Sequence, residues 1–317
     1  MKKLNICVLG GTGFIGHNLL FVLARDGHRL RVLTRRREGH RDLLVIPTLE
    51  LVETDVHLVS ELSSQFKDCD TVINLTGILN PAAGPHGDFK TVHADLPAKV
   101  VEACRFNGIR RLLHMSALQS STEGPSEYQR TKGAGEQAVL GAPDMDATVF
   151  KPSVVFGPED NFFNQFARLL RLAPFMPLAG ADTRFAPVFV GDVVEAFARC
   201  LRNRDSYGQA YELCGPKVYT LRELVRLSGR YSGHRRPVIG LGPGPARLLA
   251  RAMEFLPTPP MTRDNLASMS VDSVCHSDGL AALGIRATEL ETVVPAYLSR
   301  SGRDRYLQNL RSAARRG

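Results

Sequence analysis

A tyrosine and a lysine four residues apart are the first candidates for chemistry in this chain. Tyr128 and Lys132 stand in the stretch "SEYQRTKGAGE". Four residues is about one helical turn, so the two side chains would share one face of a helix. Such a pair could be a catalytic acid held next to a cation. Pairs at this spacing also arise by chance, about 0.2 of them in a chain of this composition. The spacing alone leaves both interpretations open.

The amino-terminal stretch "NICVLGGTGFIGHNLL" predicts a strand, a glycine turn and a helix in direct succession. Gly10, Gly13 and Gly16 stand three residues apart. Glycines allow a sharp turn and a close approach to a pyrophosphate, and the start of the following helix presents free N–H groups to it. The alternative is a tight turn without a ligand. The residues expected to contact a dinucleotide here are Gly10, Thr12, Gly13, Phe14, Ile15 and Gly16.

The end of the second predicted strand bears on the choice between the two nicotinamide cofactors. It reads Thr34-Arg35-Arg36-Arg37. An acidic residue here would bind a ribose 2′-hydroxyl, whereas a guanidinium matches a 2′-phosphate. Arg35 and Arg36 therefore favour NADP(H) over NAD(H). A solvated basic loop that tolerates either cofactor is the alternative. Residues expected near the adenosine, after the third and fourth strands, are Asp55, Val56, Leu75, Thr76 and Gly77.

The elements that must position these residues follow from an alternation of short apolar runs with longer mixed segments. This alternation is typical of repeated strand–helix units around a parallel sheet. Helices are expected at 15–25 and 96–106, each followed by a glycine, Gly27 or Gly108. The predicted fold is α/β, a Rossmann-type doubly wound parallel sheet with a smaller carboxyl-terminal lobe. The expected strands are 4–9, 30–33, 49–53, 71–75, 111–115 and 147–150.

Prolines become frequent after Gly157-Pro158, and the strand–helix alternation becomes irregular. Capping boxes at Thr220 with Glu223 and at Thr288 with Glu291 predict two helix starts there. Aromatic and aliphatic residues between 162 and 176 would line an apolar pocket or form core. The predicted division is a dinucleotide-binding domain at 1–157, a substrate lobe mainly at 158–302 whose segment 185–214 returns to the sheet, and a tail at 303–317.

Composition excludes several classes of protein. A hydrophobic content of 44% in 317 residues allows a large core, and no run of 18 apolar residues exists. The six cysteines form no C-x-x-C pair, which predicts reduced thiols, no metal site and a cytoplasmic protein. The net charge is +8, but residues 299–317 hold six arginines against one aspartate, a net +5. Nucleic-acid binding is not expected, because the folded body lacks this excess.

The tail 303–317 reads "RDRYLQNLRSAARRG" and predicts a short basic amphipathic helix. Its apolar stripe is weak, so charge would supply most of the attraction to an anionic surface. We expect weak, salt-reversible attachment to the inner face of a membrane or to a membrane complex. A solvated tail, or a helix packed on its own domain, is the alternative.

Taken together, these residues resemble the short-chain dehydrogenase/reductase superfamily in its extended or atypical branch. The resemblance covers nearly the whole chain. The motifs that carry it are "GGTGFIG", "NLTG" at 74–77, Ser116 in "HMSAL", Tyr128-x-x-x-Lys132, "KPSVVFGPED" at 151–160 and "VFVGDVVEAF" at 188–197. Within the superfamily, the chain is similar to the 39-kDa-type accessory subunits of respiratory complex I and their bacterial relatives.

The resemblance implies roles for four residues. Tyr128 would exchange a proton with the substrate oxygen, Ser116 would orient that oxygen, Lys132 would hold the nicotinamide ribose, and Pro152 would border the nicotinamide ring. The Lys132 ammonium, with the positive nicotinamide of the oxidised cofactor, would lower the pKa of Tyr128.

Three features of the sequence are compared with the pattern of this family. Only 12 residues separate Ser116 from Tyr128, fewer than is usual in extended members. His93 stands where many relatives have asparagine; it would be a pocket contact or a satisfied buried histidine. Asp192 is expected to be the N-cap of a helix that begins near Val193.

Two functions remain open. The first is an NADP(H)-dependent oxidoreductase acting on a carbonyl, an alcohol or a quinone-related small molecule. The second is a non-catalytic NADPH-binding subunit of a respiratory or quinone-biosynthesis assembly at the membrane. The complete Ser–Tyr–Lys set favours the first, and the resemblance to accessory subunits favours the second. An NADP-sensing regulator is a weaker third reading, because such proteins commonly lack the tyrosine–lysine pair.

Overall fold

The computed structural model describes residues 3–81, 84–256 and 259–299. These residues divide into two compact units, and the chain passes between the units several times. The described part of unit 1 contains 3–81, 84–152, 193–213 and 277–285, and that of unit 2 contains 153–192, 214–256, 259–276 and 286–299. The assignment of 158–302 as a substrate lobe stays a prediction.

Unit 1 is built on a seven-stranded parallel sheet with the order β11-β6-β5-β4-β1-β2-β3. The order reverses between β1 and β4, as in doubly wound folds. The central strands β1, β4 and β5 are buried almost throughout, and most of their residues are apolar. The strands are β1 (Asn5–Leu9), β2 (Arg29–Thr34), β3 (Leu49–Glu53), β4 (Thr71–Asn74), β5 (Arg111–Met115), β6 (Asp146–Pro152) and β11 (Gln209–Leu213).

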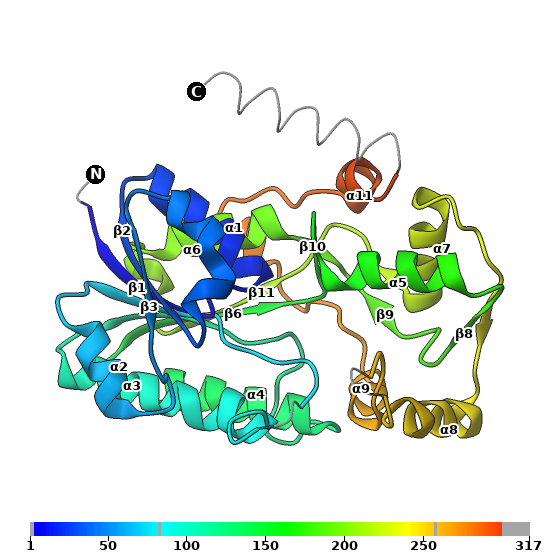
Figure 1. Ribbon diagram of the computed structural model, residues 1–317, viewed down its shortest axis with the longest axis horizontal. Helices are drawn as coiled ribbons and strands as arrows, with labels where there is room; N and C mark the ends of the chain where they lie inside the picture. The colour runs from blue at the N-terminus through cyan, green and yellow to red at the C-terminus, as the bar shows by residue number, and fades with distance from the viewer. Residues whose placement is uncertain (1–2, 82–83, 257–258, 300–317) are drawn as a thin grey trace. The chain divides into compact units, whose positions relative to one another are not determined.

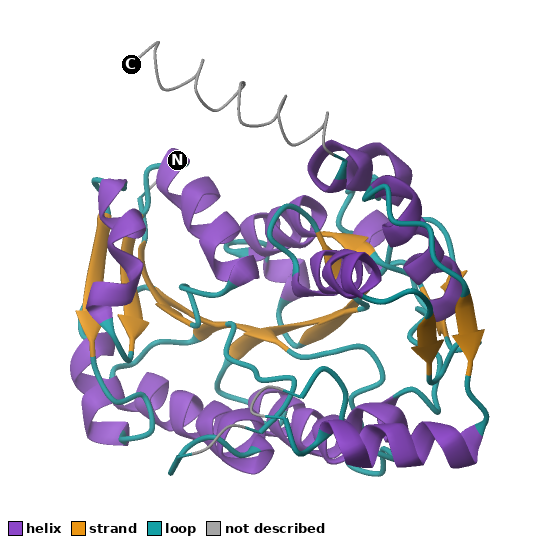
Figure 2. Ribbon diagram, turned by 45° about the vertical axis from the view of Figure 1, so that its right-hand side comes forward, coloured by secondary structure: helices purple, strands orange, loops and turns teal. Residues whose placement is uncertain are grey.

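Helices cover both faces of this sheet (Figure 1). On one face lie α1 (Phe14–Arg25) and α6 (Val190–Cys200), and on the other lie α2 (Val59–Phe66), α3 (Leu96–Phe106) and α4 (Glu127–Leu140). Figure 2 shows the strands edge-on between helical layers. The predicted fold class is confirmed. Shorter helical segments are η1 (Arg37–Val45), η2 (Thr91–Asp95), η3 (Arg204–Ser206) and α10 (Gly279–Ala282).

The strands and helices predicted in the first half are all present, with bounds that differ by at most a few residues. Gly27 and Gly108 have φ of 81° and 67°, the left-handed conformation that ends a helix. Arg111 is buried in unit 1 without a carboxylate partner among the described residues. Its guanidinium donates to the carbonyl oxygens of Cys200 and Leu201, at the end of α6, where a cation is favoured by the helix dipole.

Unit 2 consists of short strand pairs and helices. The pairs β7–β10 and β8–β13 are parallel, and β9–β12 is antiparallel. The elements are β7 (Val155–Phe156), α5 (Asn161–Leu172), β8 (Met176–Leu178), β9 (Arg184–Phe185), β10 (Val188–Phe189), β12 (Tyr219–Thr220), α7 (Leu221–Tyr231), β13 (Val238–Gly240), α8 (Pro243–Met253), α9 (Arg263–Ser268) and α11 (Leu290–Leu298).

The apolar residues between 162 and 176 mostly form core. Phe163 and Leu170 are fully buried, and Phe162, Phe166 and Met176 pack beside them in unit 2. These residues are therefore better interpreted as core than as the lining of an apolar pocket. Most of them recur at helical spacing along α5, as core residues of a helix do.

One of the two predicted capping boxes is confirmed. The Thr220 hydroxyl and the Glu223 carboxylate cap α7 reciprocally. The box at Thr288 is wrong, because its amide and hydroxyl donate to the Asp192 carboxylate at 2.7 and 2.8 Å. The N-cap role of Asp192 is also wrong, since α6 begins earlier, at Val190. A tertiary contact between distant segments outweighs both local patterns.

The prediction that all cysteines are reduced is also wrong. Cys214 and Cys275, which are 61 residues apart, form a disulfide in unit 2. Cys214 directly follows β11 and Cys275 lies two residues before Ser277, so the bond ties the segment where the chain leaves unit 1 to the segment where it returns. Scattered positions in the sequence did not reveal this proximity. The other four cysteines carry free thiols.

The predicted basic tail at 303–317 lies outside the described residues. Within the described residues, no helix combines the length and the apolar character needed to cross a membrane.

Candidate functional site

The turn between β1 and α1 is held by close backbone contacts. Gly10 has a φ of 72°, and a Cβ placed on it would lie 2.9 Å from the carbonyl carbon of Leu75. A Cβ on Gly16 would lie 2.5 Å from the Gly10 oxygen. Neither distance is compatible with a side chain, so only glycine allows β1, its turn and the end of β4 to pack in this way.

The start of α1 is open to an anion. Gly13 is the N-cap residue, and no side chain caps the helix there. Thr12, Phe14 and Ile15 flank it and are half-buried. A helix amino terminus without a side-chain cap leaves N–H groups and a positive dipole end for a negatively charged ligand. A Cβ on Gly13 would have only the Gly10 oxygen near it, at 3.4 Å.

Arg35 and Arg36 follow β2 at the carboxyl edge of the sheet, and both are exposed. Arg35 lies near enough to His57 to contribute to lowering the pKa of that imidazole, which burial lowers most. The Asp55 carboxylate accepts from the His57 amide at 2.9 Å, which shapes the turn after β3. Val56 beside it is buried. These residues therefore lie after neighbouring strands, as predicted for an adenosine site.

The segment after β4 runs from the glycine turn to the candidate catalytic residues. Asn74 accepts from the Thr76 amide and hydroxyl at 3.1 and 2.6 Å. A Cβ on Gly77 would lie 3.1 Å from Lys132 Nζ and 3.7 Å from His93 Nε2. Leu75, Thr76 and Gly77 thus connect the nucleotide turn to the tyrosine–lysine helix.

The predicted catalytic residues are brought to this same edge of unit 1. Ser116 directly follows β5, and its backbone amide donates to the carbonyl oxygen of Phe150 in β6 at 2.8 Å. Tyr128 and Lys132 lie one turn apart on α4, which a Ser126–Gln129 capping box begins. Lys132 Nζ donates to the Met115 and Thr76 carbonyl oxygens at 3.2 and 3.3 Å. Pro152 ends β6, and its carbonyl accepts from the Leu118 amide at 2.9 Å.

Burial determines the pKa of Tyr128 in this structure. Loss of hydration raises the pKa of its hydroxyl to about 12, although part of the side chain remains accessible. Burial also lowers the pKa of Lys132 to about 8. Burial therefore dominates the pKa values of both residues in the protein alone, and Tyr128 holds its proton at neutral pH. The lowering expected from Lys132 together with the positive nicotinamide of the oxidised cofactor stays a prediction.

His93 is buried and fully satisfied, the second of the two interpretations. Nε2 accepts from the Ile78 amide at 3.0 Å, and Nδ1 faces the Thr131 hydroxyl at 3.3 Å. Burial, then the Lys132 charge, lower its pKa to about 2. The neutral ring lies edge-on to Tyr128, with ring centroids 5.3 Å apart. His93 thus forms a wall of the tyrosine site without titrating.

A polar cluster behind Ser116 was missed in the sequence. The Ser116 and Ser120 hydroxyls both donate to Glu136 Oε2, at 3.0 and 2.5 Å. Glu136 Oε1 accepts from Lys151 Nζ at 3.1 Å, and both charged side chains are largely buried. The spacing of Glu136, four residues after Lys132 on the same predicted helix, could have indicated this cluster. Glu136 accepts the single hydroxyl proton of Ser116, so the predicted role of Ser116 requires this proton to turn from Glu136 to the substrate oxygen.

Close packing of α4 explains the glycines in "KGAGE". A Cβ on Gly135 would lie 1.9 Å from the His93 carbonyl oxygen. The π-helical turn η2, which carries His93, therefore contacts α4 directly. Beneath it, the buried side chains of Asn74 and His114, opposite one another in β4 and β5, leave Asn74 Nδ2 and both His114 ring nitrogens without a hydrogen-bond partner.

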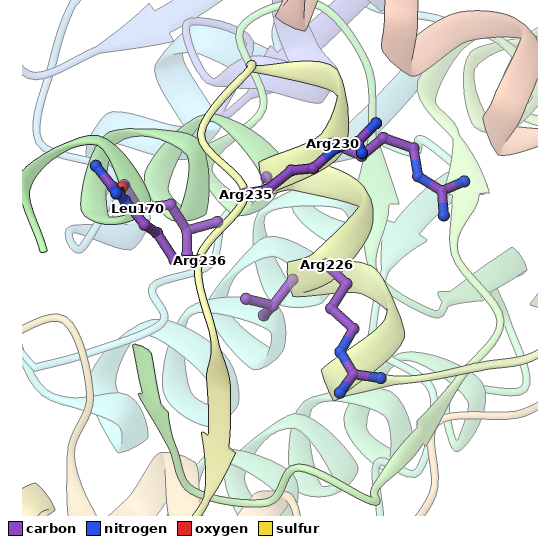
Figure 3. Close-up of a pocket in the computed structure, with 7 residues that line it drawn as sticks. Leu170, Arg226, Arg230, Arg235 and Arg236 are labelled. Carbon is purple, nitrogen blue, oxygen red and sulfur yellow. Dashed lines mark hydrogen bonds between the residues drawn. The ribbon is translucent and has the colours of Figure 1, made fainter. Parts of the chain in front are cut away.

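A hollow of about 190 Å³ in unit 2 contains none of the predicted site residues (Figure 3). It is lined by Leu170, Val225, Arg226, Gly229, Arg230, Arg235 and Arg236. The four arginines are exposed: Arg226 in the middle of α7, Arg230 in its last turn, where the helix dipole favours a cation, and Arg235 and Arg236 beyond it. This arrangement is a solvated basic face. Within the described part of the chain, no group of three or more His, Cys, Asp or Glu side chains could hold a metal ion.

Comparison with known proteins identifies the family. Residues 6–214, about two thirds of the chain, match the model of the NAD dependent epimerase/dehydratase family. The chain belongs to this family. It is an extended short-chain dehydrogenase/reductase family, as the motifs predicted.

Three relatives illustrate what the chain is similar to. "NADH dehydrogenase [ubiquinone] 1 alpha subcomplex subunit 9, mitochondrial" of Arabidopsis thaliana is 29% identical, over 86% of this chain and 71% of the relative. The Rattus norvegicus protein of the same name is 28% identical, over 95% and 81%. A "Ceramide reductase" of Caulobacter vibrioides is 31% identical, over 78% and 76%.

Solved structures share the fold of the family. A UDP-glucose 4-epimerase of Thermotoga maritima, solved with UDP-glucose, has a TM-score of 0.72 at 18% identity and covers 96% of this chain and 99% of its own. A structure of MoeE5 with UDP-glucose and NAD has a TM-score of 0.70 at 20% identity, with the same coverage of both chains. At these identities the likeness concerns the fold.

The residues of this chain fit the nicotinamide dinucleotide that the family implies. The glycine turn has no room for a Cβ at Gly10 or Gly16, and α1 begins without a side-chain cap beside it. Lys132 lies at the same edge of the sheet. It is buried, and no carboxylate of a described residue forms an ion pair with it. The individual contacts and roles of the site residues stay predictions.

Gly13→Asp separates nucleotide binding from folding. The new Cβ has room, and aspartate is a slightly better N-cap than glycine, so the free energy of unfolding should stay equal or rise by about a few tenths of a kcal/mol. The carboxylate would occupy the anion site with like charge, so affinity for NADPH should fall at least about 100-fold. Thermal unfolding and calorimetric titration measure the two effects. Gly16→Ala, which meets backbone at 2.5 Å, should instead destabilise the fold. Unchanged NADPH affinity in Gly13→Asp would place the phosphate site elsewhere.

Lys132→Met should change how stability depends on pH. The pKa of Lys132 is lowered on folding, so between pH about 8 and 10.5 the unfolded state binds the extra proton. Wild-type stability therefore rises with pH through this window, by on the order of 2 kcal/mol, and the variant lacks this rise. Denaturant unfolding at pH 7, 9 and 10.5 measures it, with the exposed Lys90→Met as the control. Parallel curves for wild type and Lys132→Met would contradict a buried ammonium.

Proposed function

We propose that the protein is an NADP(H)-dependent reductase of a carbonyl or quinone-related small molecule. The observation that carries this proposal is geometric: Tyr128 and the buried Lys132 lie one turn apart on α4, and the Lys132 ammonium contacts the ends of β4 and β5 at the nucleotide edge of the sheet. A protonated tyrosine is a proton donor, which suits reduction rather than oxidation.

The proposed chemistry assigns one task to each side chain. The dinucleotide, when bound, supplies the hydride to the carbonyl carbon. Tyr128 O–H gives its proton to the carbonyl oxygen as the C=O double bond becomes a C–O single bond, and the phenolate regains a proton from water. The Lys132 ammonium stabilises that phenolate and holds the nicotinamide ribose. Ser116 would orient the substrate oxygen by turning its single hydroxyl proton from Glu136 Oε2, to which it donates in the structure, toward that oxygen.

The preference for NADP(H) rests on Arg35 and Arg36. Both are exposed after β2 and have room to form paired hydrogen bonds with a 2′-phosphate. Glu53, the acidic residue at the end of the neighbouring strand β3, already accepts from the Arg37 amide at 2.9 Å. The family supports a nicotinamide dinucleotide in general; the choice of NADP(H) is our inference.

The names of relatives support a lipid-like substrate. Besides the ceramide reductase, a Stigmatella aurantiaca relative is a "4-hydroxy-2-methyl-3-oxo-4-farnesyl-3,4-dihydroquinoline-1-oxide ketoreductase", 25% identical over 78% of this chain and 79% of the relative. Both names describe reduction of large apolar molecules. A carbonyl on a lipid-like or quinone-related molecule is therefore the substrate class we favour.

The second candidate is a non-catalytic NADPH-binding subunit of a respiratory or quinone-biosynthesis assembly. The observation that favours it is similarity to complex I subunits over 86% and 95% of the chain. In this reading the protein is cytoplasmic and peripheral on the inner face of the membrane, with residues 303–317 as one attachment point. The intact Ser116–Tyr128–Lys132 set favours the enzyme.

Tyr128→Phe distinguishes the two functions. The change removes one hydroxyl and keeps the ring against Phe89 and His93. In a reductase, NADPH oxidation with carbonyl substrates should fall by a factor of roughly 10² or more while NADPH affinity is unchanged. Tyr231→Phe, at a half-buried tyrosine packed against the core of unit 2, is the control. A Tyr128→Phe variant that fully restores a deletion strain would exclude tyrosine acid catalysis and support the accessory subunit.

Arg35→Asp tests the cofactor preference. Wild type should bind NADPH more tightly than NADH, and the variant should lose most of this difference, about tenfold or more, because a carboxylate repels the 2′-phosphate. Fluorescence titration with both cofactors measures it. Arg29→Asp makes the same charge change at the opposite end of β2 and should have no effect. Tighter NADH binding by wild type would refute the preference; an unchanged ratio in the variant would transfer the role to Arg36 or Arg37.

A further inference from the structure

Helix α8 in unit 2 packs on its own unit through one face, which is buried or half-buried. Ala246 and Ala250 are buried, and Leu249 and Met253 are half-buried. These positions recur at helical spacing and form one stripe. The helix packs on α9, the neighbouring element along the chain (Figure 1).

Large apolar side chains that solvent contacts lie on the opposite face of α8 and directly after the helix. Leu248 on α8 is 72% exposed, and Phe255, just past the helix end at Met253, is 85% exposed. The backbone continues to wind through Leu256, whose amide donates to the Met253 carbonyl at 3.0 Å, and Leu256 is 51% exposed. Leu248, Phe255 and Leu256 thus leave exposed apolar surface at and just after α8 that the buried inner stripe does not account for.

Positive charge flanks this apolar ridge. Arg247 and Arg251 are exposed one turn apart, beside Leu248 and Phe255 on the helical wheel. Neither arginine forms an ion pair among the described residues. The acid that follows the helix, Glu254, is half-buried and accepts from the Arg263 guanidinium at 2.9 Å. The solvent-facing side of α8 is therefore both apolar and cationic.

We propose that α8 and the following Phe255-Leu256 form a membrane-docking surface that inserts into the headgroup region of an anionic lipid bilayer. A helix with apolar residues on its outer ridge and arginines beside them fits such an interface. The arginines attract anionic headgroups, and the leucine and phenylalanine side chains enter the acyl boundary. This surface is distinct from the proposed enzyme site and does not depend on it.

Charge argues against two other occupants. A second copy of this chain, placed symmetrically, would bring Arg247 and Arg251 against the same residues. The carboxyl-terminal residues 300–317 carry six arginines against one aspartate, so like charge disfavours them as a cover. An anionic surface satisfies both the arginines and the apolar ridge. An acidic protein partner is an outcome of the test.

The test measures sedimentation of the full-length protein with vesicles. We expect binding to vesicles of phosphatidylcholine with roughly one-third phosphatidylglycerol, and weaker binding to phosphatidylcholine alone or at high salt. Leu248→Ser/Phe255→Ser and Arg247→Gln/Arg251→Gln should each weaken binding about tenfold or more. The matched control Leu172→Ser/Phe106→Ser, at positions 70% and 82% exposed, should bind like wild type. Unchanged thermal unfolding of each variant checks that it is folded.

A fluorescent reporter gives a second measurement. The chain contains no tryptophan, so Phe255→Trp introduces a single probe. Its emission should shift to shorter wavelength with phosphatidylglycerol vesicles, and that of Phe106→Trp should not. An unshifted Phe255→Trp would overturn the proposal.

Three further outcomes would overturn the proposal. One is that wild type does not bind the anionic vesicles, including the case where an acidic protein binds α8 instead. Another is that the Leu248→Ser/Phe255→Ser variant binds like wild type while deletion of 303–317 abolishes attachment, which would assign it to the tail. The third is concentration-dependent self-association that the same double variant abolishes.

Discussion

The ammonium group of Lys132 constrains much of unit 1 around it. A buried charge loses its hydration, and no carboxylate of a described residue forms an ion pair with this one. The carbonyl oxygens of Met115 and Thr76 accept its hydrogen bonds instead. These two groups belong to the ends of β5 and β4, so the register of the sheet and the position of α4 must be kept together. Gly77 leaves the space that the ammonium occupies.

The same charge and the same burial fix the protonation of the neighbours. His93 and His114 are neutral, because burial and the nearby ammonium lower their pKa values to about 2 and about 3. A neutral His93 can accept from the Ile78 amide and so fix the wall against which Tyr128 lies. Tyr128 in turn retains its hydrogen. The site therefore consists of groups with fixed hydrogen-bonding roles at neutral pH, a form of preorganisation that favours proton donation.

The two units use charge differently. In unit 1 the charged side chains near the site are buried and engaged, as in the contact of Glu136 with Lys151 and with the hydroxyl of Ser116. In unit 2 many arginines are exposed, both at the end of α7 and on α8. Buried charges specify a geometry, whereas exposed charges attract partners and respond to salt. This division is consistent with catalysis or nucleotide binding in one unit and attachment through the other.

The sequence by itself determined the strand–helix alternation, the glycine turn at Gly10 and the pairing of Tyr128 with Lys132 on one helix. These features depend on periodicity and on local backbone freedom, which neighbouring residues specify. Only the tertiary structure decided that burial raises the pKa of Tyr128 and lowers that of Lys132, since burial depends on the elements that pack around them. It also decided the Cys214–Cys275 disulfide and the contact of Asp192 with Thr288, each between segments more than 60 residues apart. Such contacts follow from the path of the whole chain, and no local pattern encodes them.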